Sequence, residues 1–208
     1  MDGNKSANTI YLRELDWDRK LNIHTTGRDD SDSDEQNFPY EPTPYVVLER
    51  LSESGYIRKE HHVLDCGCGK GRVCFFLTDA CGCRTTGIDM SEKMVQIAEN
   101  NRSRFPKKKQ VDFQKCSAEY FKFTDEDILF FFNPFTETIL HGVIGHIRKS
   151  WCANPRQIRL FCYYPSDEFV SCLMTEPDFI FEDEIDCRDL FDGNNARERI
   201  LIFKMDTV

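Results

Sequence analysis

A glycine-rich turn between two apolar segments is the feature of this sequence most suited to binding a ligand. It reads Asp65-Cys66-Gly67-Cys68-Gly69-Lys70-Gly71 and closes the apolar run at residues 61–66. Because glycine has no Cβ, the backbone N–H groups of such a turn can approach a ligand closely, and the N-terminus of the next helix adds partial positive charge. Three classes of cofactor are bound by turns of this kind.

The residues within the turn argue against two of these classes. A phosphate-binding Walker loop needs G-x-x-x-x-G-K-[ST], whereas Lys70 stands between two glycines and no Ser or Thr follows it to hold magnesium. A dinucleotide fingerprint needs a small residue at the position of Arg72, which makes NAD or FAD the weaker alternative. Asp65, just before the glycines, would repel a pyrophosphate but attract a cationic ligand. The turn therefore favours a positively charged ligand.

The turn and a second segment resemble the first two motifs of the class I S-adenosylmethionine-dependent methyltransferases. The second segment is Thr86-Gly87-Ile88-Asp89-Met90-Ser91, and the resemblance extends from about residue 40 to the C-terminus. It implies that Asp65 engages the methionine ammonium directly or through water, that Asp89 accepts both ribose hydroxyls, and that Met90 lies against the adenine. The same resemblance makes the turn glycines part of the cofactor site: Gly67, Gly69 and Gly71.

The resemblance also implies roles for three further segments. Ser117-Ala118-Glu119 matches the segment that reads the adenine amino edge, although the family usually has Asp where Ser117 stands. Residues 40–45 look like an upstream Thr-Pro segment, which would bring Thr43 to the methionine carboxylate. Asn133-Pro134-Phe135 resembles the [DNS]-P-P-[YFW] motif of amino-group methyltransferases, in which the Asn oxygen and the following carbonyl accept hydrogen bonds from the target amine and an aromatic ring stacks on it.

The residues expected to position the acceptor allow a second interpretation. One proline of the motif is missing, so Asn133-Pro134 can equally be a turn that ends a strand, with Phe135 in the core. Tyr163, Tyr164 and Asp167 are expected to line the acceptor pocket, or else the two tyrosines cap the core with their hydroxyls in water. The histidines of the next helical segment, His141 and His146, flank its apolar stripe and are predicted to be surface residues.

These candidates must be positioned by alternating strands and helices, and the sequence predicts that alternation. Strands are predicted at residues 61–66, 84–89, 111–116, 127–132, 157–164, 179–186 and 198–205. Helices are predicted after the glycine turn, from a cap at Ser91 to a stop at Pro106, over 139–149 with Arg148 and Lys149 in the last turn, and from about residue 166. We therefore predict an α/β fold with a doubly wound, mostly parallel seven-stranded sheet of the Rossmann-like methyltransferase type and an antiparallel edge hairpin.

Composition limits the class of protein and its surroundings. The chain has 208 residues, 40% of them hydrophobic and 30% charged, which is typical of one globular domain. We expect an N-terminal extension at residues 1–38, partly flexible, and a cofactor-binding domain at 39–208. The longest apolar run is residues 128–132 and the polar start has no signal-peptide pattern, so we expect a cytoplasmic protein without a membrane span. The ten cysteines are then free thiols, and five clustered ones are predicted to be small packing residues rather than a metal site: Cys66, Cys68, Cys74, Cys81 and Cys83.

The charge of the chain argues against tight binding to nucleic acid. The net charge is −9 and the isoelectric point is about 5.1, whereas phosphate neutralisation needs clustered Lys and Arg. One basic run does occur within residues 102–109, but it is expected at the amino ends of the strands, away from the cofactor. An acidic run at residues 29–35 is expected to be a solvated loop.

These observations together predict an S-adenosylmethionine-dependent methyltransferase that acts on a nitrogen or oxygen acceptor of a small molecule or a protein. Methyl transfer from a sulfonium is an in-line displacement that requires positioning and no metal. A nucleic-acid amino-group N-methyltransferase, acting on RNA or DNA, is the alternative that Asn133-Pro134-Phe135 favours. A non-catalytic protein that keeps the fold and docks partners through acidic residues 29–35 and 182–186 is the third hypothesis.

Overall fold

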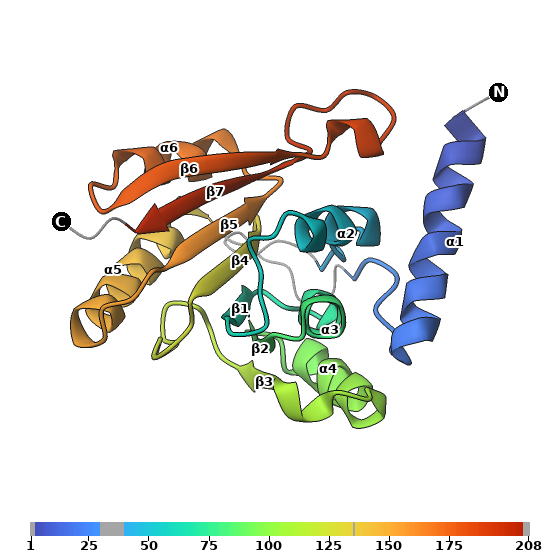
Figure 1. The fold of residues 1–208 in the computed structure, drawn as a ribbon, viewed down its shortest axis with the longest axis horizontal. Coiled ribbons are helices and arrows are strands. Elements are labelled where there is room, and N and C mark those ends of the chain that lie inside the picture. Colours follow the sequence, from blue (N-terminus) through green and yellow to red (C-terminus); the bar gives the residue numbers. More distant parts are fainter. Residues whose placement is uncertain (1–2, 30–39, 135, 206–208) are drawn as a thin grey trace.

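The centre of the molecule is a seven-stranded sheet with the strand order β3-β2-β1-β4-β5-β7-β6, seen in a computed structural model that describes residues 3–29, 40–134 and 136–205 (Figure 1). Strands β1 to β5 are mutually parallel, β7 is antiparallel to β5, and β6 is antiparallel to β7. The predicted parallel sheet with an antiparallel edge pair is confirmed. The strands are β1 His62–Cys66, β2 Arg84–Asp89, β3 Val111–Lys115, β4 Ile128–Phe132, β5 Arg159–Tyr163, β6 Phe179–Asp186 and β7 Arg199–Met205.

Helices cover both faces of this sheet. Figure 1 shows α2, α3 and α4 on one face, α5 and α6 on the other, and α1 outside α2 and α3, with which it makes its helix contacts. Within the described residues the α-helices are α1 Gly3–Leu21, α2 Tyr45–Glu53, α3 Arg72–Cys81, α4 Glu92–Arg104, α5 Glu137–Ala153 and α6 Asp167–Thr175. None of them is both long and apolar enough to cross a membrane.

Strand β4 shows why a central strand can consist of apolar residues alone. Ile128 and Phe130 belong to the core under α2 and α3, whereas Leu129 and Phe131 belong to the core under α5 and α6. Side chains of a strand alternate between the two faces of the sheet, and here both faces are covered. An unbroken apolar run is therefore the pattern expected of a strand that is buried on both faces.

Helix boundaries follow local signals in most places. Ser91 caps α4, because its hydroxyl accepts a hydrogen bond from the Met94 N–H at 3.2 Å. Ser166 caps α6 in the same way through the Phe169 N–H, also at 3.2 Å. The predicted cap at Ser91 and the predicted start of a helix at about residue 166 are confirmed, and α4 ends at Arg104, two residues before Pro106.

The prediction for the end of α5 was wrong. The helix was expected to stop at residue 149 with Arg148 and Lys149 in its last turn, but it continues to Ala153. It ends where Pro155 disfavours helical backbone in the residue before it. Arg148 forms ion pairs with Glu176 and Asp178 instead of lying at the helix C-terminus.

Helix α1 lies within the expected N-terminal extension and was not predicted. It contacts α2 and α3, and Leu21 at its end is part of the buried core. The boundary between an extension at 1–38 and a domain at 39–208 remains a prediction. The acidic run at 29–35 lies, except for Asp29, outside the described residues.

Candidate functional site

The predicted cofactor residues meet at the carboxyl edge of the sheet. Strands β2, β1 and β4 are adjacent and parallel, so the segments that follow them, including Met90, Gly67 and Asn133, emerge at one edge. Asp65, one residue before the end of β1, is paired in register with Gly87 on one side and Phe130 on the other. Open parallel sheets bind ligands in the crevice outside these strand ends.

The glycine turn depends on conformations that other residues avoid. Gly67, Gly69 and Gly71 all have positive φ, at 85°, 51° and 87°. A Cβ at Gly67 would lie 2.8 Å from Pro134 Cβ, so the turn after β1 packs directly on the turn after β4. The N–H groups of Gly67 and Cys68 both donate to the Ile88 carbonyl at 2.9 Å, which ties the turn to β2.

Asp89 joins the glycine turn to the start of α4. Its Oδ2 accepts a hydrogen bond from the Gly69 N–H at 2.8 Å, and its Oδ1 accepts one from the Ser91 N–H at 2.9 Å. The neighbouring Met90 is 45% exposed, which is unusual for a large apolar side chain next to a core strand. A carboxylate fixed beside an exposed apolar surface can hold a ligand with hydroxyl groups and a flat ring.

Asp65 is a buried carboxyl group without a charged partner among the described residues. It is 3% exposed, and it accepts a hydrogen bond from the Cys74 thiol at 3.9 Å. Burial, together with the negative charge of Asp89, raises the pKa of Asp65 from 3.8 to about 8. A cationic ligand group would stabilise the ionised form, so this carboxyl group is suited to an ammonium.

The segment after β3 lies beside the end of β2. The Cys116 N–H donates to the Asp89 carbonyl at 2.9 Å, and Ser117 and Ala118 follow directly. Ala118 is buried, and the Ser117 carbonyl accepts a hydrogen bond from the Tyr120 N–H at 2.9 Å, which makes a tight turn. Their roles in adenine recognition stay predictions.

Thr43 is buried and lies in a polar network centred on Arg72. The Thr43 carbonyl accepts a hydrogen bond from Arg72 Nη1 at 3.2 Å. Arg72 is only 2% exposed; it also donates from Nε to the Thr25 hydroxyl at 2.8 Å and pairs with Glu14 of α1. Thr43 thus contacts this network, and its contact with the methionine carboxylate stays a prediction.

The turn after β4 has a strained backbone. Asn133 has a φ of 42°, in the left-handed region that Asn tolerates better than most residues. Pro134 packs on Gly67, as described above, so the turn lies against the candidate cofactor loop. Phe135, the predicted stacking residue, lies outside the described residues. Non-glycine residues in such conformations are concentrated at functional sites.

The two tyrosines at the end of β5 form an aromatic group with Phe132. The ring centroid of Phe132 lies 4.7 Å from the ring centroid of Tyr163 and 6.3 Å from that of Tyr164. Tyr163 is buried and donates its hydroxyl hydrogen to Glu198 at 2.7 Å, while the Tyr164 hydroxyl accepts from Asn195 at 2.7 Å. The interpretation that the hydroxyls lie in water is therefore wrong for Tyr163, and both hydroxyls are held by the segment that precedes β7.

Tyr164 also has an unusual backbone conformation. Its φ is 51°, which is rare for a bulky residue, and it is the first residue after β5, as Asn133 is the first after β4. Arg197 stabilises this conformation, because its Nη2 donates to the Tyr164 carbonyl at 3.0 Å and its guanidinium lies 4.3 Å from the ring centroid. Two neighbouring strand ends thus hold left-handed residues at the predicted acceptor position.

The remaining residues singled out in the sequence, Asp167, His141 and His146, lie on α5 and α6. Asp167 is the first residue of α6, directly after the turn that follows β5. His141 is exposed on α5, as predicted, and His146 is partly exposed.

Sequence reasoning missed Tyr40 and the role of Arg72. A Cβ at Gly69 would lie 2.1 Å from the Tyr40 ring, so this ring stands directly over the glycine turn. The Tyr40 hydroxyl donates to the Thr25 carbonyl at 2.7 Å, and Thr25 also receives Arg72. No local pattern marks such contacts, because the partners are 15 and 47 residues apart in the chain.

Comparison with known proteins agrees with this architecture. Residues 63–146, which run from β1 into α5, match the family model of a methyltransferase domain. Among curated protein sequences, none matches this chain at a significant level.

Solved structures share the fold at low sequence identity. An RNA methyltransferase from Salinibacter ruber, in complex with S-adenosyl-L-homocysteine, has a TM-score of 0.56 and 15% identity, covering 81% of this chain and 95% of that chain. The MccD protein has a TM-score of 0.61 and 14% identity, covering 78% and 98%. A geranyl diphosphate methyltransferase in complex with GPP and sinefungin has a TM-score of 0.59 and 12% identity, covering 79% of each chain. At these identities the likeness establishes the fold.

Proposed function

We propose that this chain, which contains a class I S-adenosylmethionine-dependent methyltransferase domain, transfers a methyl group to a nitrogen or oxygen atom of a small molecule or a protein side chain. The observation that supports a cofactor at the carboxyl edge is the meeting of Asp65, the glycine turn and Asp89 at that edge. Asp65 supplies a buried carboxyl group for the methionine ammonium, and Asp89 supplies a fixed carboxylate for the ribose hydroxyls. The bound cofactor provides an electrophilic methyl group.

The residues of the chain would contribute positioning rather than proton chemistry. Methyl transfer needs the acceptor lone pair in line behind the methyl group, at near-attack distance and shielded from water. Asn133 and the Pro134 carbonyl are the proposed hydrogen-bond acceptors for an amino group, and Phe135 is the proposed stacking residue. Tyr163 and Tyr164 would line the same pocket, although their hydroxyls already have protein partners.

A small-molecule or protein acceptor is preferred over nucleic acid because of where the positive charge lies. The basic residues 102–109 span the end of α4 and the turn before β3, and β3 begins at Val111, so they lie at the amino end of the sheet. Two of them are already paired: Arg102 with Glu99 and Asp112, and Lys107 with Asp79. An acceptor bound there would be on the wrong side of the sheet for methyl transfer.

A cytoplasmic location is part of the proposal. All ten cysteines are free thiols, and seven of them are buried. Free thiols persist in reducing compartments, whereas exported proteins usually pair them. Cys66, Cys68, Cys74 and Cys83 belong to the two apolar cores, as small packing residues do.

Titration calorimetry with S-adenosylhomocysteine tests the cofactor assignment. We expect one site per chain, and Asp89→Ala should weaken binding by about 10- to 100-fold, since hydrogen bonds to a charged group contribute about 1.5–3 kcal/mol. Asp192→Ala, an exposed acid in the turn between β6 and β7, is the matched control and should leave the affinity unchanged. Absence of heat at high micromolar ligand would contradict the assignment.

Turnover is tested separately. Incubation of the protein with methyl-labelled cofactor and fractionated cell extract should give labelled small molecules or labelled protein. Cofactor binding without any labelled product would favour the non-catalytic alternative. Labelled RNA or DNA alone would favour the nucleic-acid alternative.

A further inference from the structure

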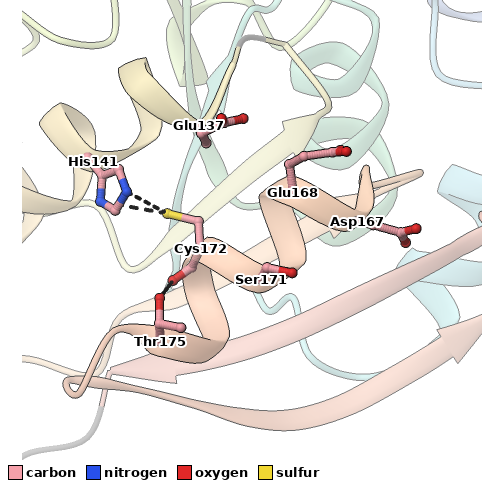
Figure 2. Close-up of a pocket in the computed structure, with 7 residues that line it drawn as sticks. All are labelled: Glu137, His141, Asp167, Glu168, Ser171, Cys172 and Thr175. Atoms are coloured by element: carbon pink, nitrogen blue, oxygen red, sulfur yellow. Dashed lines mark hydrogen bonds between the residues drawn. The ribbon is translucent and has the colours of Figure 1, made fainter.

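A second group of chemically active side chains lies between α5 and α6, on the face of the sheet opposite α3. Figure 2 shows the His141 ring of α5 directly beside the Cys172 thiol of α6. Both residues line a pocket of about 450 Å³. Glu176, one helical turn after Cys172, completes a set whose ligand atoms all lie within 4.8 Å of one another. We call these three residues the helix-pair cluster.

The distances within the helix-pair cluster fit a tetrahedral metal site. His141 Nδ1 lies 3.2 Å from Glu176 Oε1, and Cys172 Sγ lies 3.8 Å from Nδ1 and 3.6 Å from Nε2 of the same ring. Zinc binds nitrogen and oxygen at about 2.0–2.2 Å and sulfur at about 2.3 Å, so tetrahedral angles give N···O separations of about 3.4 Å and N···S separations of about 3.5 Å. The observed separations come within a few tenths of an ångström of these values.

Surrounding residues orient the helix-pair cluster and add negative charge around it. Arg148 pairs with the other oxygen of Glu176, which fixes the carboxylate while leaving Oε1 directed at His141. Such outer-shell partners are typical of metal ligands. Three further acids line the same pocket: Glu137, Asp167 and Glu168 (Figure 2). Burial, Glu176 and Glu137 raise the pKa of the Cys172 thiol, so a bound cation is what would favour the thiolate.

We propose that His141 Nδ1, Cys172 Sγ and Glu176 Oε1 bind a zinc ion, with the fourth position open to the pocket. A mixed nitrogen, sulfur and oxygen donor set suits zinc and related late transition metals, whereas magnesium and calcium prefer oxygen alone. Binding releases the thiol proton to solvent and forms the metal–thiolate bond. The ion would clamp together the two helices that follow β4 and β5, the strands whose ends carry Asn133 and Tyr164.

Equilibrium dialysis of the purified full chain against zinc chloride tests the site. The wild type should bind one zinc ion per chain. Cys172→Ser and His141→Gln should each weaken binding at least about ten-fold, since even outer-shell partners of metal ligands change affinity by 10- to 100-fold. The matched controls are Cys152→Ser and His146→Gln, a second cysteine and a second histidine on α5 outside the cluster, and they should bind like the wild type.

A spectroscopic readout and a competing ion decide between outcomes. Cobalt in place of zinc should give the intense visible absorption of a tetrahedral thiolate site, and Cys172→Ser should abolish it. Because His141 is exposed, His141→Gln should fold even if Cys172→Ser does not. The proposal would be overturned if zinc binding were unchanged in both Cys172→Ser and His141→Gln, or if magnesium displaced zinc from the wild type as well as from these variants. Either result would show that zinc binds unspecifically to an acidic surface. Absence of zinc binding by the wild type would mean that the three side chains only hydrogen-bond the helices together.

Discussion

At the scale of single residues, Asp65 combines burial with a proposed role in binding the cofactor. Its folded-state pKa of about 8 lies above the ordinary value of 3.8, so between these pH values the folded ligand-free protein holds a proton that the unfolded chain has lost. The stability contributed by this group is therefore present below about pH 4 and is lost as the pH rises towards 8, by up to about 1.4 kcal/mol per pH unit.

Denaturant unfolding across this pH range tests the sign. The free energy of unfolding of the ligand-free protein should fall with rising pH, and Asp65→Asn, which cannot titrate, should flatten that fall. Asp112→Asn, an exposed acid on β3, is the control and should keep the wild-type slope. A slope that is identical in the wild type and Asp65→Asn would contradict the assignment of this carboxyl group.

The same group predicts a proton linked to ligand binding. If the ammonium of S-adenosylhomocysteine favours ionised Asp65, binding near neutral pH should release up to one proton per site. Calorimetry in buffers of different ionisation enthalpy measures that number. Asp65→Asn should release none, and a release unaffected by this substitution would place the titrating group elsewhere.

Gly69 tests how closely the turn is packed. An alanine here would require a left-handed backbone and would place its Cβ 2.1 Å from the Tyr40 ring. We expect Gly69→Ala to lower the free energy of unfolding by about 2 kcal/mol or more, and to weaken cofactor binding. Gly55 also has a positive φ but has open space around it. Gly55→Ala should therefore lower the free energy of unfolding only by the cost of a left-handed alanine, about 1 kcal/mol. If both variants are equally stable by urea denaturation, the contact with Tyr40 contributes nothing.

Candidate site residues could be proposed from the sequence only where the signal is local. Asp65, Asp89 and the turn glycines lie in two short motifs, each at a strand end, and the parallel sheet then brings them together. Tyr40 and Arg72 act through contacts with distant segments, so their positions depend on the whole tertiary arrangement. The left-handed conformation of Tyr164 likewise depends on Arg197, which is 33 residues away.

At the scale of elements, α1 is held to the domain by one buried cation. Arg72, the first residue of α3, pairs with Glu14 and lies 4.0 Å from Asp18, both on α1, and its guanidinium lies 4.2 Å from the Tyr45 ring. Burial works to raise the pKa of Asp18, but hydrogen bonds from Thr25 and Tyr45 and the charge of Arg72 outweigh it, so the net pKa is lowered. The helix therefore contributes an ionised side chain to the domain core.

Removal of this cation should release α1. Arg72→Met keeps much of the volume but leaves two carboxylates without their partner, which costs about 3–5 kcal/mol for a buried pair. Urea denaturation should show that loss, and limited proteolysis should cut near α1. Arg13→Ala removes an ion pair with Glu49 in which Arg13 is half exposed, and it should cost less than about 1 kcal/mol. Equal effects of the two substitutions would argue against a special role for Arg72.

The elements show the same division between local and distant signals. Strand β4 was predicted from its apolar run, since both of its faces are covered, whereas the largely exposed edge strand β6 was predicted together with the turn residues that follow it. Helix α1 was missed because its inward face carries Glu14 and Asp18 beside Trp17 and Leu21, which hides the apolar period of a helix. The end of α5 was misplaced because Arg148 and Lys149 were interpreted as the basic residues that favour the C-terminus of a helix dipole. Arg148 instead pairs with Glu176 and Asp178.

At the scale of the whole molecule, the distribution of charge separates the acceptor hypotheses. The net charge is −9, and the acidic side chains of Asp89 and Glu198 lie near the carboxyl edge where the methyl group would be presented. The basic run at residues 102–109 lies at the opposite edge and is partly neutralised by neighbouring acids. A polyanion is therefore repelled from the side of the molecule where it would have to react.

Oligonucleotide binding follows from this distribution as the last prediction. Fluorescence anisotropy with labelled single-stranded RNA should detect at most weak binding at low salt, and this binding should vanish at physiological salt, because few phosphates can be neutralised. Lys108→Glu combined with Lys109→Glu should abolish the weak binding yet leave the affinity for S-adenosylhomocysteine unchanged, since both residues belong to the turn before β3, at the far edge of the sheet. RNA binding that survives both substitutions and is strengthened by the cofactor would mean that the nucleic acid reaches the carboxyl edge. The amino-group alternative built on Asn133-Pro134-Phe135 would then replace the small-molecule or protein acceptor.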